Sequence, residues 1–193
     1  LKSGREFAEK LGRSYGLFEW IGDEKAKLVV ALLGESACAG EVVTRHLQGK
    51  EGIPGVALLK IRLFSPFPAK EIAQALHQAG TKALVVLDEG LHHGGVLPPL
   101  AQRVATAIHL HLGGQGPKVA SVIGGLGGSE VRQDHFQLMF NLADNIAEGK
   151  PYRPEPYWLD IAEDPIFAER EDQVSPKLWK KWFFLVMGIP VID

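Results

Sequence analysis

Short, continuous runs of apolar residues recur along this chain and are separated by amphipathic segments. The runs lie at residues 28–33, 56–63, 83–87 and 118–123. A run of this length, ended by a glycine or a turn, is typical of a strand that is covered on both faces. The segments between and after the runs, 40–47, 69–79, 100–108 and 129–147, have helical character. The pattern therefore predicts a doubly wound α/β fold with a mainly parallel sheet and helices on both faces.

The two ends of the chain differ from this repeating middle part. Residues 3–11 form a short amphipathic pattern that leads through two glycines toward residue 20, and prolines at 151, 154 and 156 predict an extended segment. A last helix is expected after Ser175-Pro176, because proline suits a first helical turn. We expect three parts: an N-terminal helix and lead-in (1–20), the α/β domain (21–150) and a tail (151–193). The tail's aromatic residues either contact a partner or cover the domain's own edge: Tyr157, Trp158, Trp179, Trp182, Phe183 and Phe184.

Composition and charge exclude several classes of protein. The net charge of −2 gives no basic stripe for nucleic acid, and no apolar run is long enough for a membrane-spanning helix. Cys38 is the only cysteine, so this chain cannot form an internal disulfide or ligate an iron–sulfur cluster. The chain begins without methionine or a signal-peptide pattern. We expect a cytoplasmic protein and interpret the sequence as a piece of a longer one.

Four segments, in the same order, resemble the pyruvate:ferredoxin and pyruvate:flavodoxin oxidoreductases. The segment Gly12–Trp20 is similar to that family's Gly-Arg-x-Tyr-x-Leu-Phe, and Lys60–Phe67 is similar to its Lys-Val-Arg-Leu-Tyr-Arg-Pro-Phe. Val86–Glu89 resembles the family's Val-Leu-Asp-Arg, and Gly124–Glu130 resembles its glycine-rich turn. The resemblance covers about residues 10 to 150.

The resemblance implies a place in a thiamine diphosphate enzyme that oxidatively decarboxylates pyruvate or a related 2-oxoacid. Such an enzyme makes acyl-coenzyme A and passes electrons through iron–sulfur clusters. The matching domain resembles the C-terminal domain of transketolase, which packs against the thiamine-binding domains and helps to hold a homodimer. We therefore expect a structural, docking domain with no catalytic residue and no cofactor of its own, and with other domains of the parent enzyme as its partners.

The sequence also departs from the family pattern. Glu89 stands where a basic residue is usual, the rest of the loop up to Gly95 departs from the family's Asp-Arg-Thr-Lys-Glu-Pro-Gly, and the tail from about Asp164 does not match. The domain could therefore belong to a divergent or fused enzyme, such as a sulfite-reductase subunit. A stand-alone small-molecule enzyme that uses the loop Asp88–His93 is a further hypothesis, and a pure assembly module that self-associates through the aromatic tail is another.

Ligands of an open parallel sheet usually bind beyond the carboxyl ends of its strands. Four loops are expected there: Gly34–Gly40, Arg62–Pro68, Asp88–Gly95 and Gly124–Glu130. Within them, the candidates for contact with a cofactor are Arg62, Asp88, Gly127 and Ser129. Arg62 ends a buried strand and needs a partner. Asp88 is the candidate for that partner, in an ion pair or in contact with a ligand.

The histidines and the cysteine give no chemical site by themselves. His92 and His93 are adjacent in a loop, and His109 and His111 are two apart on a helix, so neither pair converges on a metal ion. We predict no metal site. Cys38 lies near a helix start, where a thiolate is favoured, but a small buried residue is the expected role.

Overall fold

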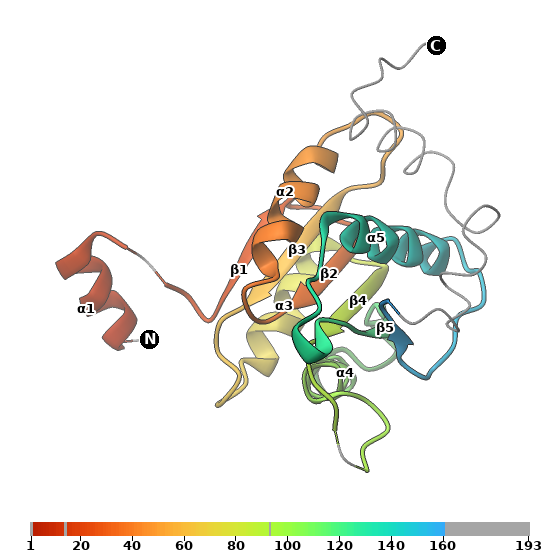
Figure 1. Cartoon of the computed structure of the whole chain (residues 1–193). Coiled ribbons are helices and arrows are strands. Elements are labelled where there is room, and N and C mark those ends of the chain that lie inside the picture. Colours follow the sequence, from red (N-terminus) through yellow and green to blue (C-terminus); the bar gives the residue numbers. More distant parts are fainter. Residues whose placement is uncertain (1, 14, 93, 161–193) are drawn as a thin grey trace.

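The computed structural model describes residues 2–13, 15–92 and 94–160, and within them a six-stranded sheet in the order β1-β3-β2-β4-β5-β6 (Figure 1). The strands are β1 (Phe18–Gly22), β2 (Leu28–Leu32), β3 (Val56–Ile61), β4 (Ala83–Asp88), β5 (Lys118–Ile123) and β6 (Tyr157–Trp158). Strand β1 pairs antiparallel with β3, and all other pairs are parallel. The predicted α/β class and the mainly parallel sheet are confirmed.

From β2 onward, strands and α-helices alternate along the chain. The helices are α1 (Lys2–Leu11), α2 (Ala37–Leu47), α3 (Ala69–Ala79), α4 (Pro99–Leu112) and α5 (Gln133–Ala147), with short 3-10 turns η1 (Gly113–Gln115) and η2 (Leu126–Gly128). Helix α3 has the predicted bounds. Helix α5 begins four residues later than predicted, because residues 129–132 form a separate loop ahead of it.

Alternate residues of the central strands enter two different cores. Leu28, Val30 and Leu32 of β2 lie in the core beneath α2 and α5. Val29 and Ala31 lie in the core beneath α3 and α4. Every residue of β2 and of β4 is buried, as their continuous apolar runs predict. Helices therefore cover both faces of the sheet, as expected.

Two strands were not among the four predicted from apolar runs. Strand β1 is only partly buried and carries a glutamate, and β6 has two residues directly after a proline. Both lie at edges, where a strand needs no continuous apolar run. The tail residues Tyr157 and Trp158 thus extend the domain's own sheet. The predicted last helix and the other tail aromatics lie outside the described residues.

The sheet changes direction between β2 and β4. From β2 the chain passes through α2 to β3 on one side, and after α3 it returns to β4 on the other side of β2. Helix α2 lies on one face and α4 on the opposite face. The loops that leave β2 and β4 therefore diverge and leave a crevice at the carboxyl ends of these strands.

Helix α1 stands apart from the sheet, at the end of an extended segment (Figure 1). The ring of Phe7 lies 5.5 Å from the ring of Tyr15. The guanidinium of Arg62 lies over the Tyr15 ring at 4.9 Å. This chain of contacts links α1 to the carboxyl end of β3. Within the described residues no helix is both long and apolar enough to cross a membrane.

The close approach of α2 to α5 depends on a residue without a side chain. A Cβ placed on Gly40 would lie 2.5 Å from the ring of Phe136, which is fully buried. Replacing a glycine inside a helix by alanine normally raises the free energy of unfolding by about 1 kcal/mol. Here the added methyl group would force the buried ring to move, and overpacking of this kind costs about 1–3 kcal/mol.

We predict that Gly40→Ala lowers the free energy of unfolding by about 1–2 kcal/mol, because the clash outweighs the gain in helix propensity. Urea denaturation of the purified chain measures this. The double variant Gly40→Ala/Phe136→Leu is expected to lose less than the sum of the two single variants, because leucine leaves room for the methyl group. A stabilised Gly40→Ala variant would contradict the proposed packing.

Candidate functional site

A cleft of about 400 Å³ lies at the carboxyl edge of the sheet, at the crevice between β2 and β4. Three loops build its walls: the turn from β2 into α2, the start of the loop after β4, and the glycine-rich connection from β5 to α5. Its lining residues are Glu35, Ser36, Cys38, Ala39, Glu89, Gly125, Gly128, Ser129, Glu130 and Val131. These loops include three of the four that the sequence predicts at this edge.

Carboxylates dominate the charge of this cleft. Glu35, Glu89 and Glu130 line it, and no lysine or arginine is among the lining residues that the structure describes. The side chain of Glu89 lies between two loops: its carboxylate oxygens are 3.7 Å from the Cβ position of Gly34, and its Cγ is 3.2 Å from that of Gly125. The three side chains come from three separate loops, so the fold itself gathers the negative charge.

Asp88, directly before Glu89, has a different environment. Its two carboxylate oxygens accept hydrogen bonds from the backbone N–H groups of Leu100 and Ala101, at 2.8 and 2.9 Å. These amides lie in the first turn of α4, where no intrahelical acceptor exists. Burial raises the pKa of Asp88, and the two backbone hydrogen bonds oppose that rise. Asp88 therefore caps α4 and does not face the cleft.

Arg62 does not pair with Asp88, contrary to the hypothesis from sequence. Its guanidinium bonds to the carboxylate of Glu19 and lies over the ring of Tyr15. Strand β2 separates β3, which Arg62 follows, from β4, which Asp88 ends. Glu19 lies next to Arg62 because β1 pairs with β3, and β1 was not among the predicted strands. Arg62 lies outside the cleft.

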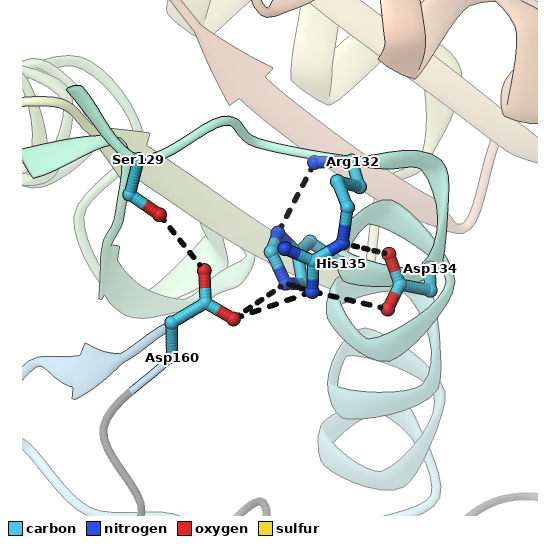
Figure 2. Close-up of polar contacts among 5 residues, drawn as sticks. All are labelled: Ser129, Arg132, Asp134, His135 and Asp160. Carbon is cyan, nitrogen blue, oxygen red and sulfur yellow. Dashed lines mark hydrogen bonds and ion pairs between the residues drawn. The ribbon is translucent and has the colours of Figure 1, made fainter.

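A polar cluster fixes the glycine-rich wall of the cleft (Figure 2). The hydroxyl of Ser129 donates to one carboxylate oxygen of Asp160 at 3.0 Å. The other oxygen of Asp160 lies 3.1 Å from Nε2 of His135 and 3.3 Å from a terminal nitrogen of Arg132. Asp160 follows β6, whereas the other three residues precede or begin α5. The carboxylate therefore ties the end of β6 to the β5–α5 connection.

The ring of His135 is held on both sides. Nδ1 accepts a hydrogen bond from the backbone N–H of Arg132 at 3.1 Å, so the ring hydrogen is assigned to Nε2, which faces Asp160. The guanidinium of Arg132 lies 2.7 Å from Nε2 of His135, and both groups contact the same oxygen of Asp160. His135 is 1% exposed. It is a buried part of the helix cap and is closed to solvent.

The cluster favours the ionised form of Asp160. Partial burial acts to raise the pKa of Asp160, but its electrostatic interaction with His135 and its contacts with Ser129 and Arg132 outweigh this effect and lower that pKa. The pKa of Arg132 is raised: burial opposes the rise, and Asp134 and Asp160 cause it. Asp160 also has a positive φ of 59°, a conformation that aspartate and asparagine tolerate better than most residues.

This cluster does not form a nucleophilic triad, although it contains serine, histidine and aspartate. In such a triad the histidine accepts the proton of the nucleophile. Here the hydroxyl of Ser129 donates to Asp160, and Nε2 of His135 faces the same carboxylate. No base therefore activates the serine. The geometry is that of a structural connection between two segments.

The remaining sequence candidates lie as follows. Gly127 has a positive φ in η2, with no atom within 4 Å of its Cβ position, and it does not line the cleft. Cys38 is exposed and lines the cleft, so its expected role as a small buried residue is wrong. His92 is exposed, and His93 lies outside the described residues. Among described residues, no three histidine, cysteine or acidic side chains are placed to hold a metal ion.

The loop Asp88–His93 does not gather an acid–base centre from its described members. Asp88 is bonded to α4, Glu89 lines the cleft, and His92 is exposed. Strand alternation sends consecutive residues to opposite faces. This arrangement does not give the converging histidine and carboxylate groups that a stand-alone enzyme using this loop requires.

The sequence interpretation missed His135, Arg132 and Asp160. Arg132 and His135 have the three-residue spacing of a helix cap, and this local signal was available. Asp160 lies 25 residues after His135 in a segment taken as an acidic tail. Its role depends on the pairing of β6 with β5, which nothing local indicates.

A comparison with protein-family models matches residues 26–136 to the description "Pyruvate:ferredoxin oxidoreductase core domain II". The matched range contains β2 through β5 and the first residues of α5. It therefore includes the strand-end loops that line the cleft.

Curated relatives cover most of this chain. This chain is 34% identical over 151 residues to the pyruvate-flavodoxin oxidoreductase of a Nostoc species, and the alignment covers 78% of this chain and 36% of that relative. The pyruvate synthase subunit PorA of Thermotoga maritima is 33% identical over 151 residues, with 77% and 37% covered. The alpha subunit of the NADH-dependent phenylglyoxylate dehydrogenase of Aromatoleum evansii is 28% identical over 156 residues, with 80% and 36% covered. The chain thus spans little more than a third of these relatives.

We predict that Asp88→Asn lowers the free energy of unfolding by about 1–3 kcal/mol, because the amide group presents a donor to one of the two α4 amides. Urea denaturation measures the loss, and amide hydrogen exchange should localise it to the first turn of α4. Glu89→Gln is the matched control, since the neighbouring side chain caps nothing and should change stability by less than about 0.5 kcal/mol. Equal effects of the two variants would contradict the capping role.

We predict a pH-dependent loss of stability for Asp160→Asn. The lowered pKa of Asp160 stabilises the fold above the ordinary value of 3.8, and this contribution disappears as pH falls through the lowered pKa. The side chain is 37% exposed, so solvent screening limits the loss near neutral pH to below about 1 kcal/mol. Denaturation curves from pH 7 to pH 3 should therefore converge for wild type and variant.

Asparagine tolerates the same positive φ as aspartate, so this variant isolates the charge. Ser129→Ala, which removes one hydrogen bond and keeps the charge, should retain most of the pH dependence. A constant difference between wild type and Asp160→Asn across this pH range would show that the ionised carboxylate contributes nothing.

Proposed function

Because this chain belongs to the pyruvate:ferredoxin oxidoreductase family, whose core domain II it matches, we propose that it is a docking domain without catalytic groups of its own. The enzyme around it would act on a 2-oxoacid: pyruvate and phenylglyoxylate, named in the relatives, both carry this group. The substrate would lose its carboxyl group as CO₂, pass two electrons to an acceptor such as ferredoxin and transfer its acyl group to the thiol of coenzyme A.

Neither the cysteine content of this chain nor its described cleft fits the cofactors of that reaction. Iron–sulfur clusters need several cysteine thiolates, and Cys38 is the only cysteine in the chain. Thiamine diphosphate and coenzyme A carry phosphate groups, which the carboxylates of Glu35, Glu89 and Glu130 would repel. We therefore place all three cofactors elsewhere in the parent enzyme, whose homodimeric assembly is a further part of the proposal.

The observation that carries the docking role is the acidic cleft itself. Three glutamates from three loops line one crevice, and no described lining residue compensates their charge. Such an arrangement attracts a basic side chain, and complementary charge guides and orients association between protein surfaces. We propose that a lysine or arginine of an adjoining domain or subunit of the parent enzyme enters this cleft.

We predict that Glu89→Lys, introduced into this chain within its parent enzyme, weakens assembly and lowers turnover together. The new ammonium group would meet the partner's cation, and like charges in such a site cost several kcal/mol. Size-exclusion chromatography with light scattering measures the assembly. Reduction of a viologen dye that depends on a 2-oxoacid and coenzyme A measures the activity.

Glu24→Lys is the matched control, because Glu24 is exposed in the turn before β2, at the opposite end of the sheet. It should leave assembly and turnover unchanged. Turnover of a 2-oxoacid by the isolated 193-residue chain would overturn the non-catalytic role. Sulfite-dependent electron transfer in place of 2-oxoacid oxidation would assign the domain to a different enzyme, such as a sulfite-reductase subunit.

A further inference from the structure

A second hollow lies far from the acidic cleft, at the outer edge of β5 on the face covered by α3 and α4. It has a volume of about 450 Å³. Ala105 of α4, Val119 and Ser121 of β5, and Leu97 ahead of α4 form three of its sides. Tyr152 and Pro154 close it from the segment 151–156, which we call the strap.

The path of the chain explains why no described helix covers the outer part of β5 on the face of α3 and α4. The connection β2–α2–β3 moves toward the β1 edge of the sheet and places its helix on one face. The connection β4–α4–β5 moves toward the β6 edge and places its helix on the opposite face. The two connections therefore have the same handedness. The connection β5–α5–β6 steps to the same side as β4–α4–β5, but α5 lies on the face of α2. The connection β5–α5–β6 therefore has the opposite handedness, although connections between parallel strands of one sheet nearly always share the same handedness. Among the helices that the structure describes, none follows α4 over this face of β5.

The strap does not fill the gap that remains. Prolines occupy three of its six positions, and β6 pairs with β5 only at Val122 and Ile123. The strap bonds to itself and to the start of β6: the backbone N–H of Arg153 donates to the hydroxyl of Tyr157 at 3.1 Å, and its guanidinium donates to the carbonyl of Pro156 at 2.9 Å. It therefore lines one side of the hollow and leaves the hollow open.

The lining side chains of the hollow are mainly apolar, and two of them, Ser121 and Tyr152, carry a hydroxyl group. Ser121 is 4% exposed, and its hydroxyl finds no hydrogen-bond partner in the structure. A buried hydroxyl without a partner is unfavourable, so a ligand atom that bonds to it is favoured. None of the described lining residues is charged. A carboxylate or phosphate would therefore lose its hydration without compensation.

We propose that this hollow binds a small, uncharged, mainly apolar molecule with one carbonyl or similar acceptor, which Ser121 recognises. The volume lies within the range of about 300–1,000 Å³ that small-molecule sites occupy. Because none of the described lining residues is charged, the hollow is not suited to the carboxylate of a 2-oxoacid. The proposal does not depend on the docking role of the acidic cleft.

The test uses two probes that differ by one carboxylate: acetophenone, an aryl ketone, and phenylglyoxylate, the same ketone with a carboxylate attached. Backbone amide shifts of the full chain are followed by NMR during titration. Acetophenone should shift Val119, Ser121 and Ala105 with a dissociation constant of about 1 mM or below. Phenylglyoxylate should leave these amides unchanged.

Variants then test the assigned residues. Ser121→Ala should weaken acetophenone binding about 5–10-fold, the usual effect of one hydrogen bond. Ala105→Phe should abolish binding by filling the hollow, whereas Thr106→Phe, on the exposed side of the same helix, should not. No shift with acetophenone, equal shifts with phenylglyoxylate, or an unchanged affinity of Ser121→Ala would each overturn the proposal.

Discussion

The burial of β2 and β4 on both faces is the constraint on which the rest of this structure depends. Every residue of these two strands is buried, and their side chains alternate between two separate cores. Apolar strands of this kind are stable only when helices cover both faces. The helices that follow β2 and β4 must therefore leave toward opposite faces, and the loops between strand and helix must separate. The acidic cleft follows from this separation, because it lies where those loops diverge.

The same alternation explains how two neighbouring carboxylates take different roles. Asp88 is the last residue of β4 and points toward α4, where both of its oxygens bond to backbone amides. Glu89 follows it, and its side chain lies between the loops of the cleft. A carboxylate that caps a helix is occupied by its hydrogen bonds and unavailable to a partner. The next carboxylate, without such bonds, remains available. An aspartate–glutamate pair at this position thus supports the fold with one residue and charges the cleft with the other.

The features that were predictable from sequence are those with strong local signals. Continuous apolar runs indicated β2 through β5, and the alternating helices indicated the layered architecture. Strand β1 could not be recognised in the same way, because an edge strand such as Phe18–Gly22 is only partly buried. This omission led to the wrong partner for Arg62, since Glu19 becomes its neighbour only when β1 pairs with β3. Ser129 was recognised as a candidate, but Asp160, its partner, lies 31 residues away. Contacts of that separation depend on how the chain closes the sheet, which local patterns do not encode.

The edge strand β6 connects the acidic cleft with the apolar hollow. Because α5 lies on the face of α2, its first turn and the loop before it form a wall of the acidic cleft. Within the described residues, the same placement leaves the opposite face of β5 without a helix of its own, and there the proline-rich strap borders a hollow whose described lining residues carry no charge. Asp160, directly after β6, fixes the first of these regions through Ser129 and His135. Tyr157, in β6, fixes the second through Arg153. A short edge strand of two residues, with the aspartate that follows it, is therefore connected to both the acidic cleft and the apolar hollow. The two sites differ in charge because of the residues that line them. The acidic cleft is lined by loops at the strand ends, whereas the hollow is lined mainly by apolar side chains of β5 and α4.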